Sequence, residues 1–478
     1  MNDLNQSISK LLSRNDKLEI IIQEQAALIE SQNKIIAEQA EKISELEKRL
    51  NKNSRNSSKP PSSDGLKKPP KTTSLREPST NKSGGQQGHK GETLKQVVHP
   101  DKTKRHELMF CPECGLSLQD KAVVGLIKRQ VFDIPEPKVE VVEHEAETKY
   151  CPCCVKEVST PFPKEVAAPV QYGPVIRSWA VYYQNQHFIP EDRLQQLFID
   201  MYGVSIATAT LSHYNAVAYQ ELSSFEETTL ALAKHAPVKH LDETGFRVGG
   251  KTQWMHTLST TATTYYHVSP KRKSLLDGLK GIVVHDHWKP YYQLEDVQHS
   301  LCNQHHLREL KALIENSNEE WALRMSRFFR LALGYRHWYE MRQIPQHRLN
   351  QFEKIYDRII ENGLVWHESL PSLAFQKKRG KKKRRPGHNL LLRLKKYKED
   401  VLRFLHDPNA PFTNNEAERD LRMVKCKQKI SGGFRSENGA KQFARIRGFI
   451  NTARKQGWNI LESIKAIFSG SLPCPAQG

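Results

Sequence analysis

The sequence of 478 residues contains no uninterrupted run of 18 apolar residues, so it predicts no transmembrane helix. Its first residues, Met-Asn-Asp-Leu-Asn-Gln, show neither the basic nor the apolar segment of a secretory signal. Cysteine is scarce, and five of the eight cysteines form two clusters. In a long chain without a secretory signal, clustered cysteines predict metal binding rather than disulfides, and we expect a cytoplasmic protein.

Acidic residues are few relative to basic ones. The chain has 73 Lys and Arg against 53 Asp and Glu, which gives a net charge of +20. A charge of this size predicts a polyanionic partner, and nucleic acid is the usual one. The basic residues do not form one cluster of the kind that binds a membrane surface, so we expect DNA and no membrane partner.

Residues 1–50 contain no Gly or Pro and carry a seven-residue repeat. One column of the repeat is apolar except for Asn15, and its companion column mixes Leu with Gln. The first column contains Ile8, Ile22, Ile29, Ile36 and Ile43. This period predicts a coiled coil that joins copies of the chain into a homo-oligomer. The alternative is one amphipathic helix packed on the rest of the protein.

Residues 51–105 are rich in Ser, Pro, Gly and Lys, with 13 basic against 4 acidic residues. Such a segment cannot bury enough apolar surface to fold, so we interpret it as a basic linker. A linker of this charge is suited to lie along a phosphate backbone, and a solubilising tether is the alternative.

Two Cys-x-x-Cys pairs in residues 106–160 predict a structural zinc site. The ligands would be Cys111, Cys114, Cys151 and Cys154, because two such turns complete a tetrahedral set of sulfur ligands. Cys153 is surplus and competes with Cys154. The 36 residues between the pairs alternate from Val131 to Val142, which predicts a small sheet there.

Residues 161–232 are expected to be helical, with the pattern of a helix-turn-helix broken at Tyr202-Gly-Val and a second helix capped by Ser205. A helical hairpin that does not read DNA is equally compatible. From residue 233 the pattern changes to strands at 238–242, 252–260, 263–268 and 281–286, with a turn at Gly249-Gly250 and a short helix at 275–279. Residues 311–400 and 401–470 are expected to be helical, and 471–478 to be a tail.

Three acidic residues stand at the ends of these elements. Asp242 and Asp286 each end an apolar strand, and Glu418 lies in an expected helix. Carboxylates suit Mg²⁺ or Mn²⁺, and two such ions support phosphoryl transfer. Glu416 competes with Glu418, because residues two apart on a helix point about 200° apart. Glu243 follows Asp242, but successive strand residues face opposite sides.

Several histidines lie near these acids. His285 and His287 flank Asp286, and alternation places both on the other face of the strand, which favours packing over catalysis. A second zinc site at Cys302, with His305 or its neighbour His306, is a less favoured alternative to ordinary packing.

These motifs together resemble the transposases of the insertion sequence 66 family. The resemblance includes the N-terminal repeat, Asn-Ser-Ser-Lys-Pro-Pro-Ser-Ser-Asp-Gly, the two Cys pairs, Leu-Asp-Glu-Thr-Gly and Val-His-Asp. It continues through Leu-Cys-Asn-Gln-His-His-Leu-Arg-Glu-Leu at 301–310, Asn-Asn-Glu-Ala-Glu-Arg and Ser-Gly-Gly-Phe-Arg. Two departures touch no predicted chemistry: the extra Cys153, and Cys426 at a position where an apolar residue is expected.

The resemblance implies a DDE transposase of a multidomain α+β class. Its RNase H-like α/β core would span 233–310 and 401–470, with 311–400 as a helical insertion. The acids of the family match Asp242, Asp286 and Glu418, which favours Glu418 over Glu416. The implied activity is metal-dependent cleavage at element ends and strand transfer into target DNA, in the nucleoid of a bacterium. Accessory proteins encoded by the same element would be further partners. A DNA-binding protein without catalysis is the alternative.

Basic residues in two places are expected to contact the DNA backbone. The first set is the run Lys377, Lys378, Arg379, Lys381, Lys382, Lys383, Arg384 and Arg385 in the insertion, for which a solvated loop is the alternative. The second set follows the predicted catalytic Glu and comprises Arg419, Arg422, Lys427, Lys429 and Arg435.

Overall fold

The computed structural model describes residues 2–53, 56–57, 94–371, 373 and 384–476. Most of the predicted basic linker and the basic run from Lys377 to Lys383 lie outside these residues. The chain forms two compact units. One comprises Met1–Lys68, His144–Ile199 and Val204–Gly478, and the other comprises Pro69–Glu143 with Asp200–Gly203. No helix in the described ranges is both long and apolar enough to cross a membrane.

Helix α1 (Asn2–Leu50) confirms the helix predicted for residues 1–50. Its apolar side chains from Leu18 to Leu50 are exposed: Ile22 is 62% exposed, Ile29 57% and Ile36 61%. Their exposure does not fit the alternative in which the apolar stripe packs on the rest of the protein. The coiled coil itself stays a prediction.

The prediction of a sheet between the two Cys pairs is wrong. Residues 131–142 contain no strand. A small hairpin joins β1 (Thr148–Cys151) to β2 (Lys156–Ser159) around the second Cys pair, and an isolated antiparallel bridge, Phe110 with Ser117, flanks the first. Pro135 and Pro137 explain the difference, because proline has no N–H group to donate to a sheet.

Four helices follow: α2 (Pro174–Asn185), α3 (Glu191–Tyr202), α4 (Thr208–Glu221) and α5 (Ser223–His235). The break at Gly203 is confirmed, and this glycine has the left-handed φ of +66°. The predicted cap at Ser205 is wrong, because α4 begins at Thr208 and has Ala207 as its N-cap residue. The chain between Gly203 and Ala207 is therefore non-helical for longer than the sequence pattern indicated.

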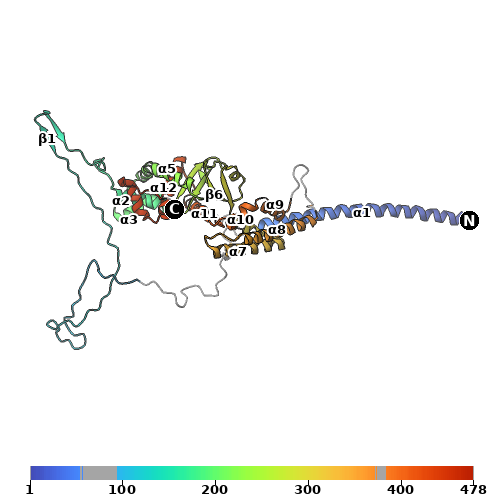
Figure 1. The fold of residues 1–478 in the computed structure, drawn as a ribbon, viewed down its shortest axis with the longest axis horizontal. Coiled ribbons are helices and arrows are strands. Elements are labelled where there is room, and N and C mark those ends of the chain that lie inside the picture. The colour runs from blue at the N-terminus through green and yellow to red at the C-terminus, as the bar shows by residue number, and fades with distance from the viewer. Residues whose placement is uncertain (1, 54–55, 58–93, 372, 374–383, 477–478) are drawn as a thin grey trace. The chain divides into compact units, whose positions relative to one another are not determined.

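A five-stranded mixed sheet follows the helices (Figure 1), with strand order β5-β4-β3-β6-β7. Strands β3, β4 and β5 are antiparallel, whereas β6 and β7 run parallel to β3. This topology is consistent with an RNase H-like core. The bounds are β3 Val238–Val248, β4 Lys251–Ser259, β5 Thr264–Ser269, β6 Gly281–His285 and β7 Val297–Leu301.

The turn between β3 and β4 lies at Gly249 and Gly250, as predicted, and both have positive φ (+53° and +79°), which suits a tight hairpin. The short helix expected at 275–279 is absent from that described segment. Five residues give one helical turn, too short to be stable alone, and Gly278 has a φ of +72°. A 3-10 helix forms instead at Lys289–Gln293.

Helices cover both faces of the sheet. On one face, Ala233 of α5 packs with Leu241, Leu258 and Val283. On the other face, Leu421 and its neighbours in α11 pack with residues of α12 against β3, β4 and β5. The C-terminal helices are α11 Asn415–Ser431, α12 Glu437–Lys455 and α13 Ile460–Ser469.

The segment predicted to be a helical insertion is helical and has its own hydrophobic core. This core also contains Leu301, which precedes the insertion, and Phe412, which follows it. Figure 1 shows α7 and α8 beside each other, and the two helices are in contact. The insertion helices are α6 Asn303–Ser317, α7 Glu320–Tyr339, α8 Gln346–Ser369, α9 Pro386–Lys396 and α10 Lys398–His406.

Candidate active site at the edge of the sheet

The pairing of β3 with β6 brings two of the predicted acids together. His240 pairs with Val284 in a parallel register. This is the last pair of the ladder, and the same register continued by two residues would bring Asp242 opposite Asp286, just after β6. The charge of Asp286 is among those that raise the pKa of Asp242, in agreement with this proximity. The Asp286 carboxylate accepts a hydrogen bond of 2.8 Å from the backbone N–H of Trp288, which fixes the loop after β6.

Asn414 attaches the third predicted acid to the sheet. It is the N-cap residue of α11 and is buried. Its side-chain amide donates to the carbonyl of Leu241 (2.7 Å), and its side-chain oxygen lies 3.0 Å from Nδ1 of His240. Both partners immediately precede Asp242. Glu418, in the first turn of α11, is therefore held at a fixed position relative to β3.

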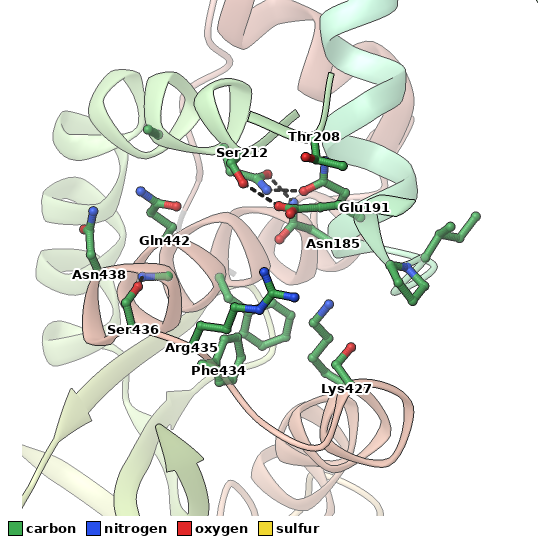
Figure 2. A pocket seen from close by; sticks show the side chains of 18 of the residues that line it. Asn185, Glu191, Thr208, Ser212, Lys427, Phe434, Arg435, Ser436, Asn438 and Gln442 are labelled. Atoms are coloured by element: carbon green, nitrogen blue, oxygen red, sulfur yellow. Dashed lines mark hydrogen bonds between the residues drawn. The ribbon is translucent and has the colours of Figure 1, made fainter. Parts of the chain in front are cut away.

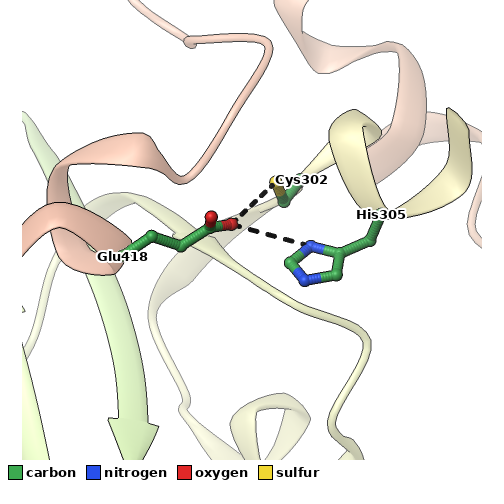
Figure 3. Close-up of side chains that lie close together, drawn as sticks. All are labelled: Cys302, His305 and Glu418. Atoms are coloured by element: carbon green, nitrogen blue, oxygen red, sulfur yellow. Dashed lines mark hydrogen bonds and ion pairs between the residues drawn. The ribbon is translucent and has the colours of Figure 1, made fainter. Parts of the chain in front are cut away.

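Glu418 faces the beginning of α6 (Figure 3). One carboxylate oxygen lies 3.9 Å from Sγ of Cys302 and 4.0 Å from Nδ1 of His305. The other oxygen lies 3.9 Å from the guanidinium of Arg308. Burial raises the pKa of Glu418, while the charges of Arg308 and Arg422 oppose that rise.

The three acids influence one another electrostatically. Burial raises the pKa of Asp242 well above its usual range, and the charges of Glu243, Asp286 and Glu418 raise it further. Burial, together with the charge of Glu243, raises the pKa of Asp286 to about 6. The sheet edge thus gathers negative charge that a bound cation would neutralise.

Glu416, the competitor of Glu418, has other partners. It forms ion pairs with Arg419 (2.5 Å) and with Lys455 (3.8 Å). Neither Asp242 nor Asp286 has Glu416 among the charges that shift its pKa in the described structure, whereas both are affected by Glu418. Of these two acids of α11, Glu418 is thus the one whose charge acts on both aspartates, and its choice as the third ligand stays a prediction.

Glu243 is a carboxylate whose role the sequence reasoning missed. Only 2% of its side chain is exposed, and it accepts hydrogen bonds of 3.0 and 2.7 Å from Arg272 and one from the hydroxyl of Tyr291. The Arg272 guanidinium lies over the rings of Trp254 (4.8 Å) and Trp288 (4.6 Å). Alternation along β3 gave no signal for this pairing, because Arg272 comes from the loop after β5.

The donor set fits a hard divalent cation. Three carboxylates from β3, the end of β6 and α11 offer oxygen ligands, which Mg²⁺ and Mn²⁺ prefer. Within the described residues, Arg308 and Arg422 act on Glu418, whereas Arg272 acts on Asp286 and is already paired with Glu243. The two aspartates therefore have no cation of their own to balance their charge among these side chains.

The histidines next to Asp286 are packed. His285 is fully buried and lies 2.9 Å from a ring nitrogen of His299. Burial lowers its pKa to about 3. The His287 ring contacts the Tyr397 ring with centroids 4.7 Å apart. The predicted packing role of both residues agrees with these contacts.

The two Cys pairs have matching local geometry, each within its own unit. In the first pair, backbone N–H groups of Cys114 and Glu113 lower the pKa of Cys111. In the second pair, the backbone N–H groups of Cys154 and Cys153 lower the pKa of Cys151. The Cys154 N–H donates to the Cys151 sulfur over 3.4 Å. Thiolates stabilised by backbone N–H groups are suited to bind zinc.

The residue after each pair also matches. Gly115 has a φ of +76°, and Val155 has a φ of +52°. A β-branched residue rarely adopts this conformation, so the turn at Val155 is imposed by the pair itself. Cys154 occupies the place that Cys114 has in the first pair.

A large pocket lies between α4 and the turn that joins α11 to α12 (Figure 2). Its volume is about 1030 Å³. Arg435 and Lys427 extend from the turn and from α11, opposite Thr208 and Ser212 of α4. Two of the predicted DNA-contacting residues thus face the second helix of the predicted helix-turn-helix.

The turn that carries Arg435 is attached to β3. The Phe434 N–H donates to the carbonyl of Arg247 (2.9 Å). A side chain at Gly433 would lie 2.7 Å from that carbonyl oxygen, so this position requires glycine. Of the other predicted DNA contacts, Arg384, Arg419 and Arg422 are exposed, and Arg385 donates to the carbonyl of Pro371 (2.8 Å).

Comparison with known proteins identifies the family. Residues 110–155, which span both Cys pairs, match the zinc-finger binding domain of transposase IS66, and residues 9–95 match a family of unknown function (DUF6444). A stretch of 75 residues is 37% identical to an uncharacterized protein, y4jO, of Sinorhizobium fredii, and covers 15% of this chain and 23% of that relative. Residues 169–442 match the transposase IS66 family. This match covers more than half of the chain, which therefore belongs to the IS66 family of transposases.

Proposed function

We propose that the chain is a DDE transposase with an RNase H-like core, which cuts DNA at the ends of its element and joins those ends to target DNA. The observation that supports the proposal is the parallel register of β3 and β6, which leads toward Asp242 and Asp286, together with the attachment of the helix of Glu418 to β3 through Asn414. Family membership supports phosphoryl transfer on DNA as the reaction class.

In this proposal Asp242, Asp286 and Glu418 hold two Mg²⁺ ions, or Mn²⁺. Such a pair of ions activates the attacking oxygen and stabilises the leaving oxygen of an in-line phosphoryl transfer. The protein's part is positioning. The N–H of Trp288 orients Asp286, Asn414 orients α11, and Arg308 holds the second oxygen of Glu418.

DNA binding would use exposed basic residues of both sets. The pocket between Arg435, Lys427 and the first turns of α4 offers cations to a phosphate backbone on the side of the turn, while Glu191 and Asp192 line its other side. The second set continues with Arg419, Arg422 and Lys429. In the insertion, Arg384 and Arg385 border the basic run that lies outside the described residues.

The remaining parts would assemble the complex. Cys111, Cys114, Cys151 and Cys154 would hold a structural zinc ion, with Cys154 favoured over Cys153 by its match to Cys114. Helix α1 would form a coiled coil between copies, because its apolar stripe is exposed. Proteins encoded by the same element are further partners in this proposal.

A cleavage assay tests the proposal. The substrate is DNA that flanks the gene and carries its terminal inverted repeats, incubated with the full chain and Mg²⁺. We expect wild-type protein to cut at the repeats and to join the freed 3′ ends to a target plasmid. Asp286→Asn should bind the same DNA but should cut at least about 1000-fold more slowly, as expected when a metal ligand in a catalytic site is removed.

Glu416→Gln is the matched control for Glu418→Gln, because both change one acid in the first turn of α11. Only the change at Glu418 should abolish cleavage. Cleavage that persists in Asp286→Asn or in Glu418→Gln would refute the assignment of the acids. Binding without any cleavage by wild-type protein would favour a DNA-binding protein without catalysis.

A further inference from the structure

Beside the carboxylate cluster, three side chains of different chemistry converge on one point (Figure 3). Ligand atoms of Cys302, His305 and Glu418 all lie within 4.8 Å of one another. Cys302 is the N-cap of α6, and His305 lies three residues later in its first turn, so the helix presents both on one face. Glu418 approaches them from α11.

The kinds of donor atom select the class of cation. A thiolate and an imidazole favour Zn²⁺ over Mg²⁺, which prefers oxygen ligands. A Cys, His and carboxylate set with one open position is typical of zinc sites that have three protein ligands. The open side faces a pocket of about 260 Å³ that is also lined by Asp286, His287 and Arg393, which leaves room for a water molecule as the fourth ligand.

The distances between the donors are close to those of such a site. Glu418 lies 3.9 Å from the Cys302 sulfur and 4.0 Å from Nδ1 of His305. Tetrahedral zinc with ordinary bond lengths would place these pairs roughly 3.3–3.5 Å apart. The ligand atoms of Cys302 and His305 lie within 4.8 Å of each other, so zinc binding requires rotation of these two side chains as well as a closure of about half an ångström at Glu418.

The surroundings leave the donor atoms available. In the described part of the chain, Nδ1 of His305 is buried and has no hydrogen-bond partner. Burial and the charge of Glu418 raise the pKa of Cys302 to about 12, so a zinc ion has to displace the thiol proton. The backbone N–H of Asn414, which donates to the Cys302 sulfur at 3.2 Å, favours the thiolate that forms. Arg308 contacts the second oxygen of Glu418, so the first oxygen remains directed at Cys302 and His305.

We propose that Cys302, His305 and Glu418 form a second zinc site, separate from the site of the two Cys pairs. The thiol of Cys302 loses its proton to solvent when zinc binds. Glu418 would then be a ligand either of zinc or of the magnesium site, because the oxygen that binds zinc is not free to bind magnesium. Zinc at this position therefore inhibits DNA cleavage, a consequence that rests on the proposed function, whereas zinc binding itself does not.

Zinc content of the full chain tests the proposal. The protein is loaded with Zn²⁺, dialysed against a weak chelator and measured by mass spectrometry. We expect two zinc ions per wild-type chain, one in Cys302→Ser, and two in the control Cys474→Ser, which changes an exposed thiol elsewhere. Cys111→Ser should lose the other ion and retain one. Equal zinc contents in wild type and Cys302→Ser would overturn the proposal.

A second variant covers the case in which Cys302→Ser does not fold, since Cys302 is only 1% exposed. His305→Gln changes a half-buried side chain. It should lower the affinity for the second zinc ion by more than about 100-fold and leave the circular dichroism spectrum unchanged. Unchanged zinc affinity in His305→Gln would overturn the proposal.

The measurement needs no DNA, so its outcome is independent of the proposed reaction. A chain that cuts DNA with Mg²⁺ but keeps its full zinc content in Cys302→Ser refutes only the second site. A chain that holds two zinc ions but cuts no DNA under any condition refutes only the transposase assignment. When both hold, micromolar Zn²⁺ should inhibit cleavage in the presence of millimolar Mg²⁺.

Discussion

Replacing Asp286 by Asn measures how much the ionised Asp286 lowers the free energy of unfolding when no metal ion is bound. Burial and the charge of Glu243 raise the pKa of Asp286 to about 6, from about 3.9 in an unfolded chain. Two pKa units correspond to about 3 kcal/mol, of which about 2 kcal/mol remains after solvent screening at this partly exposed edge. Asn has the same shape, carries no charge and can still accept the hydrogen bond from Trp288.

The sign of the effect depends on pH. Because the folded-state pKa is the higher one, the ionised carboxylate destabilises the folded protein above pH 6. Below about pH 4 the carboxyl group is protonated in both states, and the difference disappears. In the presence of a chelator, Asp286→Asn should therefore be about 2 kcal/mol more stable than wild type at about pH 8, and equally stable at about pH 4.

Thermal unfolding between about pH 4 and pH 8 checks this prediction. At the higher pH with a chelator, Asp286→Asn should melt roughly 4–8 °C above wild type. With millimolar Mg²⁺ in place of the chelator, wild-type protein should gain stability and the variant should gain much less, because one ligand is missing. A variant that melts below wild type at the higher pH, or a difference that does not change with pH, would refute the electrostatic reasoning.

Three further predictions concern the surroundings of the site. Asn414→Ala removes the hydrogen bonds between α11 and β3, so it should cost about 2–3 kcal/mol in urea unfolding and reduce cleavage more than DNA binding. Gly433→Ala should destabilise the protein by about 1–3 kcal/mol, because its Cβ would lie 2.7 Å from a carbonyl oxygen. Its control, Gly334→Ala, meets no described atom within 4 Å inside α7 and should stabilise the protein by up to about 1 kcal/mol. Ile29→Lys combined with Ile36→Lys should convert an oligomer into monomers in light scattering, and an unchanged mass would refute the coiled coil.

The strands that carry the site were predictable because the runs before the two aspartates are apolar. The predicted end of the first strand at Asp242 is wrong, because β3 continues to Val248 in its hairpin with β4, and Asp242 lies within the strand. The runs before Asp242 and Asp286 are buried in the sheet, and the Gly249-Gly250 turn has the positive φ values that its sequence predicts. Strand β7 (Val297–Leu301) was missed. Its sequence, Val-Gln-His-Ser-Leu, lacks an apolar pattern, and it is a strand because β6 pairs with it and α10 packs on it.

The alternation of apolar and polar residues gave a wrong prediction where the backbone cannot form the hydrogen bonds of a strand. The alternation of residues 131–142 resembles a strand, but the prolines within it cannot complete the hydrogen bonds of a sheet. The contacts of Glu243 and Asn414 join residues far apart in sequence: Arg272 with Glu243, and Asn414 with His240. No periodicity encodes such pairs, since they depend on how loops and helices meet the sheet.

The helical insertion is part of how Glu418 is positioned. The insertion begins at α6, whose N-cap Cys302 donates its backbone N–H to the carbonyl of His285 (3.0 Å), next to Asp286. The backbone N–H of Asn303 donates to the carbonyl of Phe412 (3.0 Å), just before α11. The first turns of α6 and α11 are thus bound to each other and to the sheet. Because the core of the insertion includes residues at both junctions, changes that loosen this core should displace Glu418 even when they lie far from it.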